Sequence, residues 1–192
     1  MCLNNIKVGF ALTGSFCTFE KALLQIENFI SEGADVIPIM SFNARNINTR
    51  FGKAQDFVDK IESLTGNKVI ATIEDAEPIG PKNLTDVLVV LPCTGNTLAK
   101  LAMGIYDTPV TLAVKSHLRN QKSVVIGVST NDALSNTAKN IGTLLNYKHY
   151  YFIPMAQDDP VKKPVSVVCD FDRAVETVKY ALKGKQLEPV LI

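Results

Sequence analysis

The stretch DVLVVLPCTGNTLAKLAMG, residues 86–104, decides the fold of this chain. Residues 87–91 are all aliphatic and lack the alternation of a half-exposed strand, which is typical of a strand covered by helices on both faces. Thr94 can then cap a helix that ends at Gly104. A buried strand that leads directly into a helix is the repeating unit of a sheet of parallel strands with crossover helices.

The same alternation continues over most of the chain. Runs of β-branched or aromatic residues predict strands at residues 6–12, 35–40, 68–73, 86–91, 123–128, 150–153 and 165–169. Apolar stripes at helical spacing predict helices over residues 19–30, 54–64, 134–145 and 171–182. Gly66 and Gly184 are placed to end two of them, and Thr108-Pro109 opens a further helix to about residue 118. We therefore predict a three-layer α/β/α, doubly wound, Rossmann-like fold with a mainly parallel sheet, as one domain over residues 1–192.

Composition excludes several classes of protein. The 192 residues carry 20 Lys and Arg against 19 Asp and Glu, and no basic block is longer than Lys162-Lys163, so a nucleic-acid surface is not expected. The first apolar run is too short for a signal or a membrane span. The cysteines lack the spacing of a zinc site or a disulfide framework, and they favour a reducing, cytoplasmic setting: Cys2, Cys17, Cys93 and Cys169. No metal is predicted.

In a doubly wound sheet, ligands bind outside the carboxyl ends of the strands. The loops expected there are rich in glycine and in small hydroxyl and amide residues: 13–16, 41–43, 92–97 and 129–132. The candidate cofactor-binding residues are Thr13, Gly14, Ser15, Ser41, Thr94, Gly95, Asn96, Ser129, Thr130 and Asn131.

The first of these loops enters a helix, where free N–H groups and the helix dipole favour a phosphate. It is neither GxGxxG nor GxxxxGK[ST], so the usual dinucleotide and triphosphate motifs are absent. Taken alone, this loop is better explained as a turn and a helix cap formed by Gly14 and Ser15. Four such loops together exceed what capping needs, and they predict a flat, polar-edged cofactor such as flavin mononucleotide (FMN).

Two motifs carry a resemblance to a known family. LTGSF at residues 12–16 and LPCTGNTLAKLAMGIYDTPVT at 91–111 resemble the homo-oligomeric flavin-containing cysteine decarboxylases. A narrower resemblance, to the B chain of a two-subunit enzyme of spore-forming bacteria, is carried by further segments: 48–52 (NTRFG), 127–134 (GVSTNDAL), 152–164 (FIPMAQDDPVKKP) and GKQLEPV near the end.

The narrower resemblance implies a function and partners. It implies that the chain works with an A subunit, which carries a nicotinamide (NAD(P)) domain, to oxidise a dihydropyridine dicarboxylate to pyridine-2,6-dicarboxylate in the mother cell of a sporulating bacterium. It also implies a homo-oligomer. A dicarboxylate calls for cations, and Arg50 is the first choice as substrate-binding residue because its guanidinium suits a carboxylate, ahead of Arg119, Lys162 and Lys163.

The departures from the decarboxylases leave alternatives open. Those enzymes use a histidine upstream of the segment matching PCTGNT, and this chain has none before His117. Their Pro-Ala-Met-Asn motif is reduced here to Asn131. No catalytic residue is assigned. The alternatives are a non-catalytic flavin- or ligand-binding partner of the A subunit, or a free-standing flavin enzyme of decarboxylase or prenyltransferase type.

Three further features have expected roles. His117 and His149 are expected at the surface or at caps, and Cys93 is expected to act as a small hydrophobic residue. The segment 152–164 contains three prolines and is expected to form an extended, exposed loop that contacts a partner chain or closes over the ligand.

Overall fold

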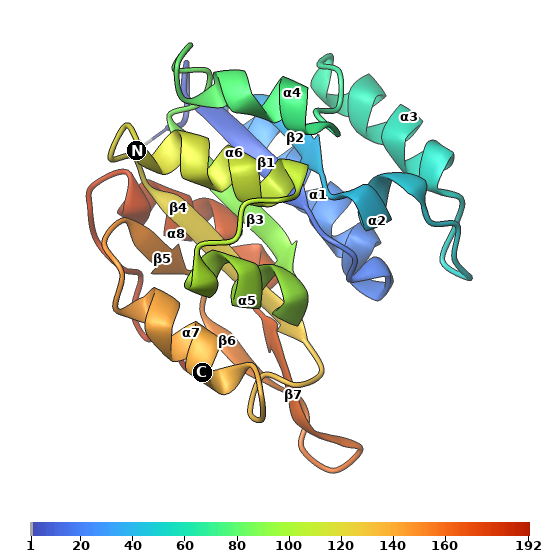
Figure 1. Ribbon diagram of the computed structural model, residues 1–192, viewed down its shortest axis with the longest axis vertical. Helices are drawn as coiled ribbons and strands as arrows, with labels where there is room; N and C mark the ends of the chain where they lie inside the picture. Colours follow the sequence, from blue (N-terminus) through green and yellow to red (C-terminus); the bar gives the residue numbers. More distant parts are fainter. Residues whose placement is uncertain (1) are drawn as a thin grey trace.

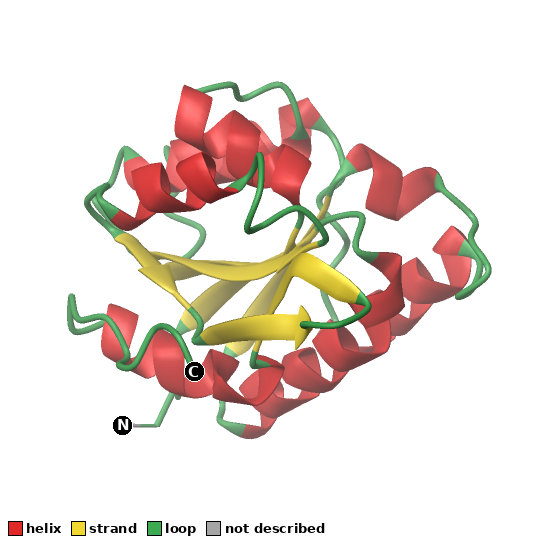
Figure 2. Ribbon diagram, turned by 90° about the horizontal axis from the view of Figure 1, so that it is seen from below, coloured by secondary structure: helices red, strands yellow, loops and turns green. Residues whose placement is uncertain are grey.

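The computed structural model describes residues 2–192 as a twisted sheet between two layers of helices (Figures 1 and 2). The strands are β1 (Lys7–Leu12), β2 (Asp35–Met40), β3 (Val87–Cys93), β4 (Val124–Thr130), β5 (Tyr150–Phe152), β6 (Met155–Asp159) and β7 (Lys163–Cys169). The helices are α1 (Phe19–Ser31), α2 (Phe42–Asn46), α3 (Ala54–Thr65), α4 (Ile73–Ala76), α5 (Gly95–Met103), α6 (Pro109–Leu118), α7 (Ala138–Leu145) and α8 (Ala174–Ala181). Short 3₁₀ turns are η1 (Phe16–Thr18), η2 (Glu77–Ile79) and η3 (Phe171–Arg173).

The strand order β2-β1-β3-β4-β7-β6 confirms the doubly wound, mainly parallel fold. Strands β2, β1, β3 and β4 run parallel, and β5 adds to the first half of β4 in the same direction. The last two residues of β4, Ser129 and Thr130, pair instead with β7, antiparallel. The β6–β7 hairpin thus extends the sheet at the point where the parallel strands end, beside their carboxyl edge.

The central strands are buried on both faces. All seven residues of β3 and the first six of β4 are buried. Contacts place α1 against α3 and α8 on one side of the sheet, and α6 against α4 and α5 on the other, with α7 against α5. The aliphatic runs without alternation therefore have the predicted cause, a helix layer on each face.

The predicted helix ends are confirmed where a cap determines them. Gly66 and Gly104, at φ of +68° and +70°, end α3 and α5 in the left-handed conformation that glycine adopts without strain. Thr108 caps α6 through a reciprocal bond with Thr111, and Pro109 is its first residue. None of the helices in residues 2–192 is long and apolar enough to cross a membrane.

One predicted strand is wrong. Residues 68–73 form only a single bridge, Ile70 with Ile39, and Thr72 then caps the short helix α4 by accepting from the N–H of Asp75. The segment lies beyond β2 at the open edge of the sheet, where partly exposed residues and an early helix cap limit the pairing to one residue.

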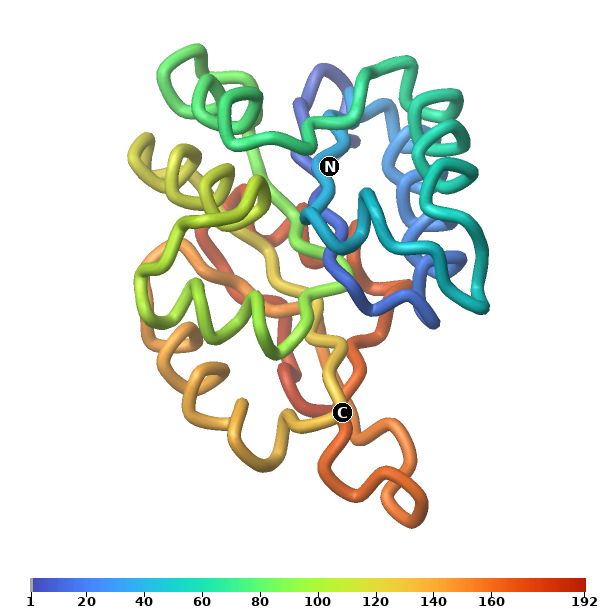
Figure 3. Tube along the Cα trace, turned by 45° about the vertical axis from the view of Figure 1, so that its right-hand side comes forward, coloured from blue at the N-terminus to red at the C-terminus, as the bar shows by residue number. Residues whose placement is uncertain are grey.

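Two other predictions need correction. Helix α7 begins at Ala138, four residues after Leu134, because residues 132–137 form turns built on Asp132, and Leu134 itself is 53% exposed. The segment 155–169 is a β-hairpin and not an irregular loop: Pro164 lies in β7, at the exposed end of the hairpin (Figure 3). The tip of this hairpin projects from the body of the molecule, so part of the segment predicted to be exposed is indeed exposed.

Candidate functional site

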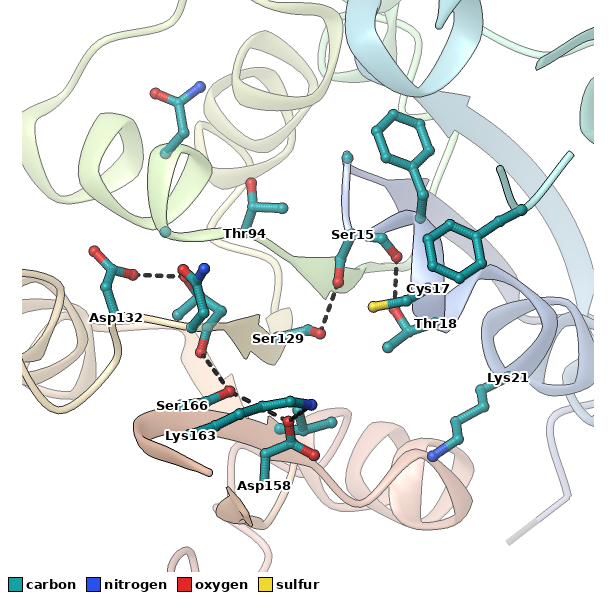
Figure 4. Close-up of a pocket in the computed structure, with 18 residues that line it drawn as sticks. Ser15, Cys17, Thr18, Lys21, Thr94, Ser129, Asp132, Asp158, Lys163 and Ser166 are labelled. Atoms are coloured by element: carbon teal, nitrogen blue, oxygen red, sulfur yellow. Dashed lines mark hydrogen bonds and ion pairs between the residues drawn. The ribbon is translucent and has the colours of Figure 1, made fainter. Parts of the chain in front are cut away.

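A cavity of about 940 Å³ opens at the carboxyl edge of the sheet (Figure 4). Its walls come from the segments after β1 and β3, from the end of β4 and the loop that follows it, from the loop between α2 and α3, from the β6–β7 hairpin, and from α1. The lining residues are Gly14, Ser15, Phe16, Cys17, Thr18, Lys21, Phe51, Thr94, Gly95, Asn96, Ser129, Thr130, Asn131, Asp132, Asp158, Lys163, Ser166 and Val168. The volume lies within the range of small-molecule and cofactor sites, about 300–1,000 Å³.

Thr13 ties two of the walls together from behind the cavity. It is buried, and its hydroxyl donates to the carbonyl of Pro92 at 2.8 Å and accepts from the N–H of Thr94 at 3.0 Å. This predicted ligand residue does not line the cavity. It fixes the position of the loop after β3 relative to the loop after β1.

Two serine hydroxyls face the cavity from opposite sides, Ser15 from the loop after β1 and Ser129 from the end of β4. Ser15 Oγ and Ser129 Oγ lie 2.9 Å apart and share a hydrogen bond, and the Ser15 carbonyl accepts from the Thr18 hydroxyl at 2.8 Å. Ser15 precedes η1, which leads into α1, and no side chain caps either start. The N–H groups of Thr18 and Phe19 already donate to the carbonyls of Ser15 and Phe16, so the N–H groups of Phe16 and Cys17 and the positive end of α1 are what remains for an anion here.

A carboxylate is already present beside the start of α5. Asp132 Oδ1 accepts from the Thr130 hydroxyl at 2.6 Å and Oδ2 from the Thr137 hydroxyl at 2.7 Å. The bond from Thr130, supported by that from Thr137, lowers the pKa of Asp132 against the opposing effect of burial. We call these three side chains the Asp132 clasp.

Gly95, the first residue of α5, fits the Asp132 clasp because it has no Cβ. A Cβ there would lie 2.8 Å from Asp132 Oδ1 and from Thr130 Oγ1, and 2.9 Å from Thr137 Oγ1. The negative charge of the Asp132 clasp thus lies against the positive end of α5. A phosphate is repelled from that end, which leaves the Ser15 side of the cavity as the better place for it.

The hairpin supplies the charged wall. Lys163 Nζ lies 2.5 Å from Asp158 Oδ2, and this bond raises the pKa of Lys163. Ser166, which is buried, lies with its hydroxyl 3.4 Å from the same carboxylate oxygen. A second cation, Lys21, reaches the cavity from α1 (Figure 4).

The structure brings most of the predicted residues together. One cavity is lined by residues from three separate segments of the chain: Gly14, Ser15, Thr94, Gly95, Asn96, Ser129, Thr130 and Asn131. Ser41 does not join them, because its hydroxyl caps α2 by accepting from the N–H of Ala44 at 3.3 Å. Arg50 is not a lining residue either: its guanidinium stacks 4.9 Å from the centre of the Phe51 ring.

Sequence reasoning did not assign Lys21 or Asp158 to the site, whereas it named Lys163 as a lesser candidate for the cation. Lys21 lies on α1 and Asp158 on the hairpin, so no loop pattern marks them. The helical periodicity offers one signal, since Lys21 follows Cys17 and Thr18 by one turn and therefore shares their side of the helix.

The expectation for His117 is wrong, because the side chain is 1% exposed. Its Nδ1 lies 2.8 Å from the Thr85 hydroxyl and its Nε2 lies 3.0 Å from the Ser123 carbonyl oxygen. Burial lowers its pKa to about 4. His149 precedes β5 at a φ of +69°, and no histidine lines the described cavity.

Cys93 agrees with its expected role as a small hydrophobic residue. It is fully buried at the end of β3, and this burial raises the pKa of its thiol. A thiol that stays protonated is a poor nucleophile.

Comparisons with known proteins identify the class. Residues 1–180 match the family model described as Flavoprotein, and the chain belongs to this family. The FMN-dependent cysteine decarboxylase SpaF shares the fold, with a TM-score of 0.71 at 23% identity over 94% of this chain and 97% of that one.

A narrower similarity is to the B subunit of dipicolinate synthase. The chain is 46% identical to that protein from Bacillus subtilis (strain 168) over 190 residues, 99% of this chain and 95% of the relative. The crystal structure of the B subunit of dipicolinate synthase from Bacillus halodurans superposes with a TM-score of 0.92 at 41% identity, covering 100% of this chain and 98% of that one. Both resemblances inferred from the sequence motifs are thereby confirmed.

Proposed function

We propose that this chain is the B subunit of a dipicolinate synthase, which acts with the A subunit of that enzyme to oxidise dihydrodipicolinate to dipicolinate, pyridine-2,6-dicarboxylate. The observation that carries the proposal is the 46% identity to a dipicolinate synthase B subunit over 99% of the chain. The proposal includes NAD(P) on the A subunit, a homo-oligomer of this single-domain chain, and a cytoplasmic location in the mother cell of a sporulating bacterium.

FMN is the proposed cofactor, and the cavity fits it in three respects. Its volume suits a cofactor of that size, it lies at the carboxyl edge of the sheet, and it combines an anion-accepting end with amide and hydroxyl groups. Ser15 and Ser129, with the start of η1 and α1, would hold the phosphate, and Asn96 and Asn131 would meet the polar edge of the ring. A flavin bound there supplies a two-electron acceptor.

The residues of the chain would bind and orient rather than move protons. Oxidation of the dihydro ring removes two electrons and two protons, so a base is needed at some point. The carboxylates that line the cavity are both engaged, Asp132 by two hydroxyls and Asp158 by Lys163, and the lowered pKa of Asp132 makes it a weak base.

That observation favours one second candidate, a non-catalytic partner that binds flavin or substrate for the A subunit. A free-standing decarboxylase-like activity receives less support, because none of the lining residues is a histidine. Assays of the two chains, separately and mixed, with dipicolinate followed by its ultraviolet absorbance, separate these candidates. Product from the B chain alone contradicts the need for the A chain, and no product from the mixture contradicts the proposed function.

Flavin binding is tested by titrating the purified chain with FMN and following the visible absorbance. Ser15→Ala and Ser129→Ala should each weaken binding by about 10- to 150-fold, the value of a hydrogen bond to a charged group. Ser31→Ala is the matched control, since its exposed hydroxyl bonds only the Asn28 carbonyl at the end of α1. Equal affinities for all three variants would place the phosphate elsewhere.

A further inference from the structure

The cavity has two ends of different charge chemistry. At one end, Ser15 and Ser129 face the start of η1 and α1 with uncharged donors. On the opposite side lie the ammonium groups of Lys21 and Lys163 (Figure 4). One site with two separate anion-attracting regions suits two different anions.

Of the two lysines, Lys21 lacks an acidic partner in the described chain. The other cation of the cavity wall is neutralised, since Lys163 is paired with Asp158. Lys21 makes no ion pair within 4.0 Å among residues 2–192, and no side-chain hydrogen bond from it is present.

Nearby acids do not compete for Lys21. Its side chain also borders a second hollow of about 340 Å³ that contains Asp170 and Asp172. Asp170 accepts from the N–H of Asp172 at 3.2 Å, and Asp172 accepts from the buried Gln25 amide at 3.3 Å. Each carboxylate already accepts one hydrogen bond from another donor, and neither forms an ion pair with Lys21 within 4.0 Å, so the ammonium of Lys21 can face an anion from solution.

We propose that Lys21 binds a carboxylate of the substrate, while the phosphate of the cofactor occupies the Ser15 end of the same cavity. This inference rests on the proposed function and deepens it by naming the residue that selects a dicarboxylate. It replaces Arg50, which stacks on the lining residue Phe51 but does not itself line the cavity. Lys163 contributes less to binding of the substrate carboxylate, because its charge is offset by Asp158.

The test measures two affinities on the purified chain. Dipicolinate binding to the FMN-loaded protein is followed by calorimetry, and FMN binding by absorbance, for the wild type, Lys21→Gln and Lys21→Arg. Lys82→Gln is the control: it removes the same charge from an exposed loop outside the cavity. In mixtures with the A subunit, KM and kcat are measured for the same set.

Lys21→Gln should weaken dipicolinate binding and raise KM by about 10- to 100-fold, with kcat and FMN affinity changed less than about twofold. Lys21→Arg should recover most of the affinity, and Lys82→Gln should match the wild type.

Three results would overturn the inference. They are unchanged dipicolinate affinity in Lys21→Gln, no dipicolinate binding by the wild type, and a loss of FMN affinity in parallel, which would make Lys21 a phosphate ligand. Failure of the wild type to take up FMN at all contradicts the proposed cofactor instead.

Discussion

Gly95 shows how one missing side chain shapes the site. Because its Cβ position lies within 2.9 Å of all three members of the Asp132 clasp, Gly95→Ala must displace at least one hydroxyl from the carboxylate. We expect unfolding free energy to fall by about 1–2 kcal/mol, the value of one or two hydrogen bonds, and FMN affinity to fall as well. Urea unfolding and flavin titration measure the two effects.

Gly142→Ala is the matched control, since a Cβ at that position in α7 meets nothing within 4 Å. It should stabilise the chain by about 0.5–1 kcal/mol, because alanine loses less backbone entropy than glycine in a helix. If both variants shift stability in the same direction, the Asp132 clasp does not explain why residue 95 is glycine.

His117 predicts a dependence of stability on pH. Its pKa is about 4 in the folded chain, against 6.5 for an unperturbed histidine, so the unfolded chain binds the proton more tightly. Stability is therefore fully present above pH 6.5 and is lost as the pH falls towards 4, by up to about 3 kcal/mol.

The measurement is urea unfolding of the wild type and His117→Gln between pH 7.5 and 4.5. The glutamine amide can still donate to Ser123 and accept from Thr85, but it does not titrate. We expect a shallower slope for the variant. Identical slopes would assign the acid sensitivity to other groups.

At the scale of elements, the β6–β7 hairpin offers a test of partner binding. Val161 at its tip is 88% exposed, on a segment that projects from the sheet. Val161→Asp should leave unfolding free energy within about 0.5 kcal/mol, as is usual for surface changes, and should lower the activity of the mixture with the A subunit. An apolar side chain that is exposed in one chain is often covered by another.

Val161→Ala, which stays apolar, serves as the control for this substitution. Binding of the A chain to each variant is measured by calorimetry. Wild-type activity and binding in Val161→Asp would show that the tip is only a connection between two strands.

Elements with local signals could be predicted from the sequence. The aliphatic run of β3, the glycine that ends α3 and the Thr108-Pro109 start of α6 each act within a few residues. The strand predicted at residues 68–73 failed because pairing depends on a neighbour, and only Ile70 finds one. The prolines of the hairpin misled because Pro154 and Pro160 lie outside its strands and Pro164 lies at the exposed end of β7, beyond the residues that pair with β4.

The residues of the candidate site also fall into two groups, those that the local sequence predicts and those that depend on tertiary packing. Loop residues after strands were predictable, since every parallel strand ends at one edge. Lys21 was not, because its approach to the cavity depends on how α1 packs against the sheet. Lys163 was named only as a lesser candidate cation, although it lines the cavity. Ser41 and Arg50 fit the pattern by residue type, yet a helix cap and an aromatic ring engage them.

For the whole molecule, FMN should act as a stabilising ligand. At 100 times its dissociation constant, a ligand that binds only the folded state adds about 2.7 kcal/mol, which corresponds to a rise in Tm of about 5–10 °C for a chain of this size. Riboflavin, which lacks the phosphate, should raise Tm much less if the Ser15 end binds that group. Equal shifts in Tm for FMN and riboflavin would show that the Ser15 end does not bind the phosphate.

The bond between Ser15 and Ser129 joins residues 114 positions apart, and the cavity wall extends to Val168. During synthesis, a growing chain therefore has no complete pocket until the hairpin has left the ribosome and paired with β4. Contacts so distant in sequence form late and slowly, while exposed strands risk aggregation. FMN should then bind only to chains that have completed folding. The fraction of a preparation that carries bound flavin, seen by its yellow absorbance, should equal the fraction of molecules in the native state.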